Sequence, residues 1–117
     1  MTATSQIEYL NLAKLYYDKN NIDKAKEYID SAMKYPEIRQ IPQAHLYKGE
    51  IYRLYYKKHE EELIRDVSIR IEAINSYMQY IKMADPSIEK RNISVAKTNA
   101  RNVVLSFYRS AAYLLNS

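Results

Sequence analysis

Residues 6–37 carry the pattern that most constrains this chain. Small and large apolar residues recur there at helical spacing on both sides of the polar pair Asn20-Asn21: Tyr9, Leu12, Ala13 and Tyr16 before it, and Ala25, Ile29 and Ala32 after it. Residues three and four apart lie on one face of a helix, and alanine lets two helices approach closely. The pattern therefore predicts two antiparallel helices that form a tightly packed hairpin.

The scarcity of turn-forming residues extends this prediction to the whole chain. One glycine and three prolines in 117 residues leave few of the residues that hairpins and strand corners require. A chain of this length is one domain and can bury a core without disulfides. We therefore expect a single all-α domain over residues 1–117, in which 13 tyrosines supply almost all of the aromatic side chains.

Capping and breaking residues predict where the first helices begin and end. Ser5-Gln6-Ile7-Glu8 is a capping box, so the first helix should start there. Asn21 should cap a second helix, which Tyr35-Pro36 ends because the residue before a proline is pushed out of the helical region. After a connector, a third helix should begin near Pro42, since proline is favoured in the first turn.

Two more helices are expected, which makes about five in all. The apolar stripe of the third helix changes phase within residues 57–62, where Glu60-Glu61-Glu62 favours a new helix start. The fourth helix has a three-and-four stripe typical of a coiled-coil seam: Ile64, Val67, Ile71, Ile74, Met78 and Ile81. Asp85-Pro86-Ser87 should start a long fifth helix, with a break allowed near residues 92–94.

Catalytic and metal-binding motifs are missing from the sequence. Cysteine is absent, a single glycine excludes phosphate-binding glycine loops, and His45 and His59 belong to no HExxH motif. We therefore expect a protein that is not an enzyme and holds no metal or cofactor. The first residues have no signal-peptide pattern, and no run approaches ~20 apolar residues, so we expect a cytoplasmic protein without membrane attachment.

The spacing within residues 6–37 resembles the tetratricopeptide repeat. With Gln6 as the first position, the characteristic residues of that family fall on Tyr9, Leu12, Ala13, Tyr16, Ala25, Ile29 and Ala32, and Pro36 stands one residue early. Residues 42–86 resemble a second, degenerate and extended repeat, with Gly49, Tyr52, Ala73, Tyr77 and Tyr80 at matching positions after an insertion. The resemblance implies a right-handed array of helical hairpins, with residues 87–117 as a C-terminal capping helix.

The same resemblance implies a groove lined by the first helix of each repeat. Its partner-binding positions are Ile7, Leu10, Lys14, Tyr17, Leu46, Glu50, Arg53 and Leu54. Leu10 and Lys14 stand where some members of the family hold a C-terminal carboxylate, so a carboxylate clamp is not expected. The alternative is that Ile7, Leu10, Leu46 and Leu54 are core residues. Among the tyrosines, Tyr16 and Tyr52 are expected in the core, and Tyr17, Tyr55 and Tyr56 are candidates for binding.

These observations predict a non-catalytic interaction module or adaptor that binds a peptide or helix of a partner protein between the first and third helices. A small chaperone of a secretion or assembly system is an alternative of similar size and repeat content. Two repeats are few for an independent stack. A homodimer formed through the fourth-helix seam or the fifth helix is therefore a further expectation.

A third alternative follows from the charge distribution. The formal net charge of +4 resides in residues 87–117, because residues 1–86 hold equal numbers of acidic and basic side chains. Lys90, Arg91, Lys97 and Arg101 could bind phosphates, as in a nucleic-acid-associated regulator. No nucleic-acid-binding motif accompanies these residues, and a solvated face is the commoner explanation for them. We therefore favour a protein over a nucleic acid as the partner.

Overall fold

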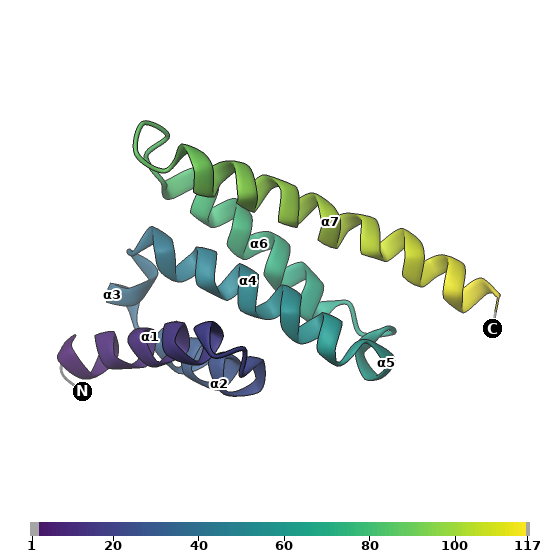
Figure 1. The fold of residues 1–117 in the computed structure, drawn as a ribbon, viewed down its shortest axis with the longest axis horizontal. Helices are drawn as coiled ribbons and strands as arrows, with labels where there is room; N and C mark the ends of the chain where they lie inside the picture. Colours follow the sequence, from purple (N-terminus) through teal and green to yellow (C-terminus); the bar gives the residue numbers. More distant parts are fainter. Residues whose placement is uncertain (1–2, 117) are drawn as a thin grey trace.

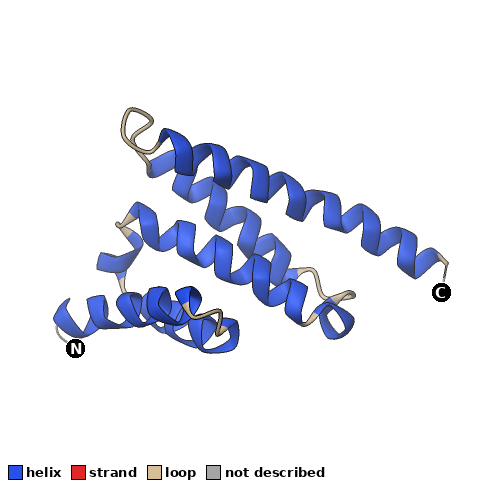
Figure 2. Cartoon of the chain, viewed as in Figure 1, coloured by secondary structure: helices blue, strands red, loops and turns tan. Residues whose placement is uncertain are grey.

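The computed structural model describes residues 3–116, which form seven helices and no strand (Figure 2). In chain order these are α1 (Ala3–Asp18), α2 (Ile22–Ala32), α3 (Pro36–Arg39), α4 (Pro42–Lys58), α5 (Glu60–Leu63), α6 (Ser68–Met83) and α7 (Lys90–Leu115). The expected all-α architecture is confirmed. The expected count of about five is exceeded because α3 and α5, of four residues each, connect the longer helices.

The five long helices pack in chain order, each antiparallel to the one before (Figure 1). α1 packs on α2, α2 on α4, α4 on α6 and α6 on α7. In addition α1 touches α4, and α4 touches α7. Helices α1, α4 and α7 therefore run in one direction, while α2 and α6 run the opposite way. The first three form one layer of the molecule, which we call the α1/α4/α7 layer.

The larger core cluster joins α1, α2, α4 and the first half of α6. Alanines with no exposed surface stand where these helices come closest, and larger side chains fill the space between them. The cluster consists of Leu10, Ala13, Ile22, Ala25, Ile29, Ala32, Ile38, Ala44, Ile51, Tyr52 and Ala73. Because alanine lets helix backbones approach, the small residues of 6–37 produce the close hairpin that the sequence predicts.

A second cluster holds α7 against α6. It consists of Tyr77, Tyr80, Ala84, Ile93 and Ala96. Tyr77 has no exposed surface and lies against the only glycine of the chain, Gly49 in the middle of α4. A glycine inside a helix normally costs stability, so its place here is explained by the ring that packs on it.

Two of the predicted helix ends are confirmed. Asn21 caps α2, since its Oδ1 accepts the backbone N–H of Lys24 at 3.2 Å. Asn20, the residue before it, has a φ of 61°, a left-handed conformation that asparagine tolerates better than most residues. The third long helix, α4, begins at Pro42.

Other predicted ends are wrong. Ser5 lies inside α1, which begins at Ala3, so it is not the N-cap. The second helix ends at Ala32, and the connector contains α3. The break after α4 lies within 57–62 as predicted, but Glu60–Leu63 form only the single turn α5, and α6 begins at Ser68.

The start of the last helix also differs from the prediction. Asp85 forms a turn, in which its Oδ1 accepts the backbone N–H of Ser87 at 2.9 Å, and α7 begins only at Lys90. From there α7 runs to Leu115 without the break allowed near residues 92–94.

The buried side of α6 is not the stripe that the spacing favours. Val67, Ile71 and Met78 of the predicted seam are exposed, Met78 by 60 %. The side that faces α4 and α7 instead carries Arg70, Ala73, Ser76, Tyr77 and Tyr80.

Candidate functional site

A half-buried carboxylate on α4 connects four helices. Glu50 Oε1 accepts hydrogen bonds from Tyr77 Oη on α6 and from Asn99 Nδ2 on α7, both at 2.6 Å. Glu50 Oε2 accepts one from Arg53 Nη2 at 2.8 Å and one from Tyr17 Oη on α1 at 3.3 Å. We call these five residues the Glu50 cluster. It spans the α1/α4/α7 layer and the helix behind it.

The cluster keeps each of its groups in one protonation state near neutral pH. Burial alone would raise the pKa of Glu50, but the hydrogen bonds from Tyr77 and Arg53 outweigh it and lower that pKa. Burial, and then the charge of Glu50, raise the pKa of Tyr77 and raise the pKa of Tyr17 to about 12. The carboxylate therefore stays ionised and the phenols stay protonated, so the hydrogen bonds persist.

An aromatic edge borders the cluster on the α1 side. The rings of Tyr17 and Tyr47 meet edge to face, with centroids 5.6 Å apart. Lys14 Nζ lies 5.4 Å from the centre of the Tyr47 ring, within reach of a cation–π interaction. All three side chains are only half-buried. This part of the α1/α4/α7 layer thus offers aromatic surface and one cation.

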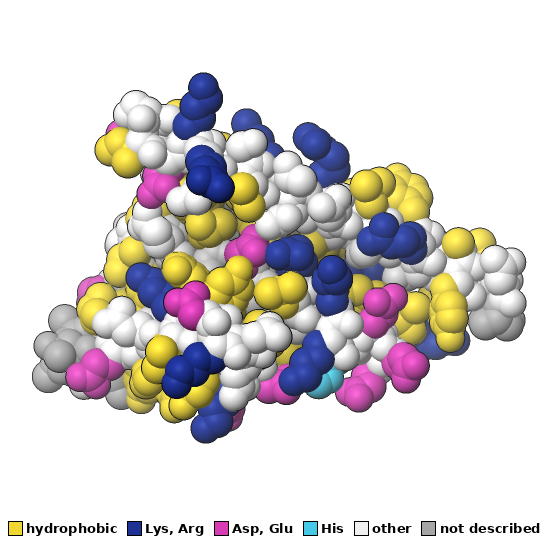
Figure 3. Space-filling model, in the orientation of Figure 1, with side chains coloured by type: hydrophobic (Ala, Val, Ile, Leu, Met, Phe, Trp, Pro, Cys, Tyr) yellow, Lys and Arg dark blue, Asp and Glu magenta, His cyan; other side chains and the backbone are white. Residues whose placement is uncertain are grey.

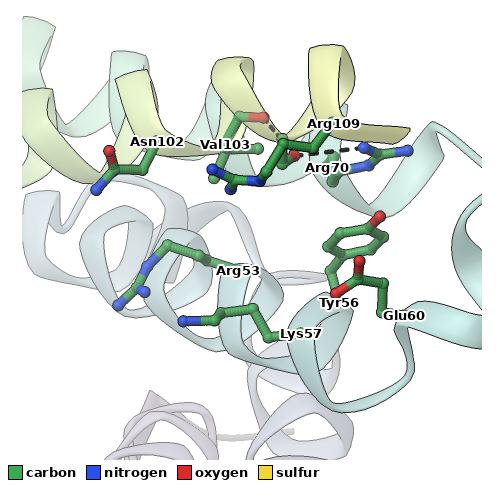
Figure 4. A pocket seen from close by; sticks show the side chains of 9 residues that line it. Arg53, Tyr56, Lys57, Glu60, Arg70, Asn102, Val103 and Arg109 are labelled. Atoms are coloured by element: carbon green, nitrogen blue, oxygen red, sulfur yellow. Dashed lines mark hydrogen bonds between the residues drawn. The ribbon is translucent and has the colours of Figure 1, made fainter. Parts of the chain in front are cut away.

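A pocket of about 370 Å³ opens on the other side of the cluster, between α4, α6 and α7 (Figure 4). Arg53 and Lys57 come from α4 and Arg109 from α7, while Arg70 of α6 lies at its base. The remaining lining residues are Tyr56, Glu60, Asn102, Val103 and Ser106. We call it the basic pocket. In Figure 3, dark blue Lys and Arg side chains gather over the middle of this face, where α4 and α7 meet.

Arg70 at the base of the basic pocket is buried, with 1 % of its surface exposed. Its Nη1 donates to Ser110 Oγ at 2.8 Å and to Ser106 Oγ at 3.3 Å, and its Nη2 donates to the Ile64 carbonyl at 3.2 Å. The guanidinium lies between two rings, 4.1 Å from the centre of Phe107 and 4.3 Å from that of Tyr56.

The structure brings together some of the predicted groove residues and separates others. Tyr17, Glu50 and Arg53 belong to one cluster, and Lys14 lies beside it. Leu10 is only 3 % exposed and belongs to the core, so it is not available to a partner.

The other apolar groove candidates divide between surface and core. Ile7 is 40 % exposed. Leu46 and Leu54 are half-buried against the two core clusters. The middle of the predicted groove is therefore polar rather than apolar.

The tyrosine assignments hold in part. Tyr52 is buried, as expected, and its hydroxyl donates to Asp30. Tyr16 is half-buried against the larger core cluster. Tyr56, a candidate for binding, is 5 % exposed and packs on Arg70, whereas Tyr17 and Tyr55 keep part of their surface exposed.

Several residues of the site escaped prediction. Lys57, Arg70, Asn99 and Arg109 come from three different helices and meet only in the folded chain. One signal was present: Arg70 stands three residues before Ala73 and therefore lies on the same side of its helix as this small residue. A charged residue on the buried side of a helix indicates an unusual polar environment at that position.

The candidate phosphate-binding residues lie elsewhere. Lys90, Arg91, Lys97 and Arg101 are all exposed on α7 and do not line the basic pocket. The histidines are also apart from it: the Nε2 of His45 lies 2.8 Å from the Arg39 carbonyl oxygen, and that of His59, at the end of α4, lies 2.7 Å from Asp23.

Within residues 3–116, no group of three or more histidine, aspartate or glutamate side chains could hold a metal ion. In the same part of the chain, none of the helices has the length and apolar character needed to cross a membrane. Comparisons with protein-family models, with curated proteins and with solved structures gave no match for this chain.

Proposed function

We propose that this protein is a non-catalytic interaction module that holds a segment of a partner protein across the α1/α4/α7 layer, whose outer side we call the binding face. One observation carries the proposal: the Glu50 cluster and the basic pocket form a continuous polar surface over α1, α4 and α7, with Arg53 common to both. Three helices thus present one surface. A peptide or helix laid across it would touch aromatic groups at one end and cations at the other.

Burial at the characteristic positions supports a tetratricopeptide-like arrangement as part of this proposal. The small residues of the first hairpin, Ala13, Ala25 and Ala32, have no exposed surface. In the second hairpin the same holds for Ala73 and Tyr77. Consecutive antiparallel packing, with contacts between alternate helices, is the geometry that such repeats adopt.

A binding role is favoured over catalysis by the electrostatics of the face. General acid–base catalysis needs a group whose pKa lies near the working pH. The pKa of Glu50 is lowered and that of Tyr17 is raised to about 12, so both move away from neutrality. The hydrogen bonds of the cluster hold side chains in place, which suits a preformed binding surface.

The test is affinity capture of partners by the wild type and by two charge variants. Lys14→Glu/Arg109→Glu reverses two cations of the binding face, and the matched control Lys34→Glu/Lys82→Glu reverses two exposed cations away from it. We expect one or more partners that the first variant loses and the control keeps. Loss in both variants, or in neither, would contradict the proposal. A single dedicated partner would favour the chaperone alternative over a general adaptor.

A second proposal, self-association, rests on the exposed side of α6. Val67, Ile71 and Met78 expose apolar surface on one face of that helix, where a second copy could cover them. Light scattering at rising concentration should show a dimer that Ile71→Glu/Met78→Glu converts to a monomer. A wild type that stays monomeric would refute this.

A further inference from the structure

The positive charge of Arg70 has no carboxylate partner anywhere in the described residues. Its two terminal nitrogens donate only to neutral oxygens, those of Ser106, Ser110 and the Ile64 carbonyl. Its Nε is buried without any hydrogen-bond partner. Burying a charge costs free energy unless an opposite charge and hydrogen bonds compensate. Arg70 is thus incompletely compensated by the chain itself.

The neighbouring cations increase this imbalance. Lys57 and Arg109 line the same pocket, are exposed, and form no ion pair with a described residue. Arg53 pairs with Glu50, outside the lining of the pocket. The only carboxylate among the lining residues is Glu60. Four cationic side chains from three helices therefore meet one carboxylate.

Two other hollows differ from the basic pocket because neither is lined by a buried cation. A hollow of about 470 Å³ beside α6 is lined by Lys48, which pairs with Glu72 at 2.8 Å, and by Arg39, which is exposed and donates to the Met33 carbonyl. A third hollow, beside α2, is lined by three acidic residues, Asp23, Glu27 and Asp30, and by one lysine.

We infer that the basic pocket is an oxyanion site, which takes a carboxylate or phosphate group. Arg109 and Lys57 would bind the anion directly, Asn102 would donate a further hydrogen bond, and Arg70 would contribute its charge from the base. The assignment of this anion to a side chain of a protein partner rests on the proposed function. The affinity of the pocket for an anion does not.

The first experiment uses small anions alone. Potassium phosphate or sodium glutarate is titrated into the isotope-labelled chain at constant ionic strength, with chloride as the balancing ion, and amide and arginine Nε–H resonances are followed. We expect saturable shifts at Asn102 and Ser106. Lys57→Gln/Arg109→Gln should weaken binding by about tenfold or more, since two charge-assisted hydrogen bonds are lost.

Lys34→Gln/Lys82→Gln removes the same net charge from exposed sites outside the pocket, so it should change the dissociation constant by less than about twofold. Equal weakening in both variants would mean unspecific attraction and would overturn the inference. So would the absence of saturable shifts in the wild type. Circular dichroism of each variant confirms that it is folded.

The second experiment distinguishes the sources of the anion. Blocked peptides that contain glutamate or phosphoserine are compared with glutamine and serine counterparts, and with a single-stranded oligonucleotide. Tighter binding of an acidic peptide than of the free anion supports a protein partner. Binding of small anions without any gain from a peptide would keep the oxyanion site but contradict the proposed function. Preferential binding of the oligonucleotide in the pocket would likewise keep the oxyanion site but contradict the proposed function.

Discussion

The ring of Tyr77 occupies the space that a side chain at position 49 would need. A Cβ added to Gly49 would lie 2.9 Å from Tyr77 Cδ1 and 3.0 Å from Cε1, closer than carbon atoms tolerate. The absence of that Cβ lets α6 approach α4 and places the Tyr77 hydroxyl on Glu50. One glycine thus contributes to the packing of the core and to the geometry of the Glu50 cluster.

Gly49→Ala should therefore destabilise the chain, although alanine is the better helix former. Overpacking a rigid core costs about 1–3 kcal/mol, while the gain in helix propensity is about 1 kcal/mol. We expect a lower free energy of unfolding in urea, by up to about 2 kcal/mol. In a Tyr77→Leu background, which removes the ring, the same change should be stabilising. Equal effects in both backgrounds would show that the contact does not matter.

Local features of the fold could be predicted from the sequence, because they depend on residues close in the chain. The spacing of Ala25, Ile29 and Ala32 and the cap at Asn21 lie within a dozen residues and produced a correct helix. The buried side of α6 could not be predicted in this way. Ile71 and Met78 have the spacing of a core stripe, but the fit of Tyr77 against Gly49 decides which side packs.

The candidate site was harder to predict because its residues come from helices that are far apart in the sequence. Glu50 and Arg53 were predicted as partner-binding residues, but their hydrogen bonds to Asn99 and Tyr77 depend on how three helices align. Arg70 and Arg109 are far apart in the sequence and meet only at the pocket. No periodic pattern in the sequence predicts that these two residues lie close together in the fold.

Glu50→Gln tests whether the charge at the centre of the Glu50 cluster stabilises the fold. The amide cannot replace the charge that Arg53 and the phenols contact, so we expect a loss of about 1.5–3 kcal/mol in the free energy of unfolding. Glu72→Gln is the matched control, because Glu72 forms an ion pair on the surface, with half of its side chain exposed. That change should cost less than about 1 kcal/mol. Similar losses in both variants would contradict a special role for Glu50.

The tyrosine–carboxylate pairs predict weaker folding at alkaline pH. Burial, and then the neighbouring carboxylates, raise the pKa values of Tyr17, Tyr52 and Tyr77 above 10.0, that of Tyr17 to about 12. At a pH between the ordinary pKa of tyrosine and the raised pKa in the folded chain, the unfolded chain releases phenolic protons that the folded chain retains. Stability from this source is therefore complete below about pH 10 and falls as the pH rises further.

Urea unfolding at a series of pH values measures this effect, with tyrosinate absorbance to report ionisation. Tyr52→Phe should show a shallower decline than the wild type above about pH 10, because one raised pKa is removed. A free energy of unfolding that stays constant up to about pH 12 would refute the account.

Substitutions of Arg70 test whether its buried charge contributes to the stability of the fold. Arg70→Met replaces an unpaired buried charge by an apolar side chain of similar length, and the hydroxyls of Ser106 and Ser110 keep their backbone acceptors. We expect a free energy of unfolding equal to the wild type within about 1 kcal/mol, or higher. Arg70→Ala, which leaves a cavity, should lose about 2–5 kcal/mol. A large loss in the methionine variant would show that the charge itself stabilises the fold.

We propose that α1, α4 and α7 together form the surface that holds a partner. Site-specific photo-crosslinking in extracts of the source cells tests it most directly, with the probe at Lys14 or Asn102 on the binding face, or at Lys34 or Lys82 away from it. We predict one crosslinked protein that is shared by Lys14 and Asn102 and absent at the other two positions. A partner captured equally from all four positions, or only from Lys34 and Lys82, would contradict the claim.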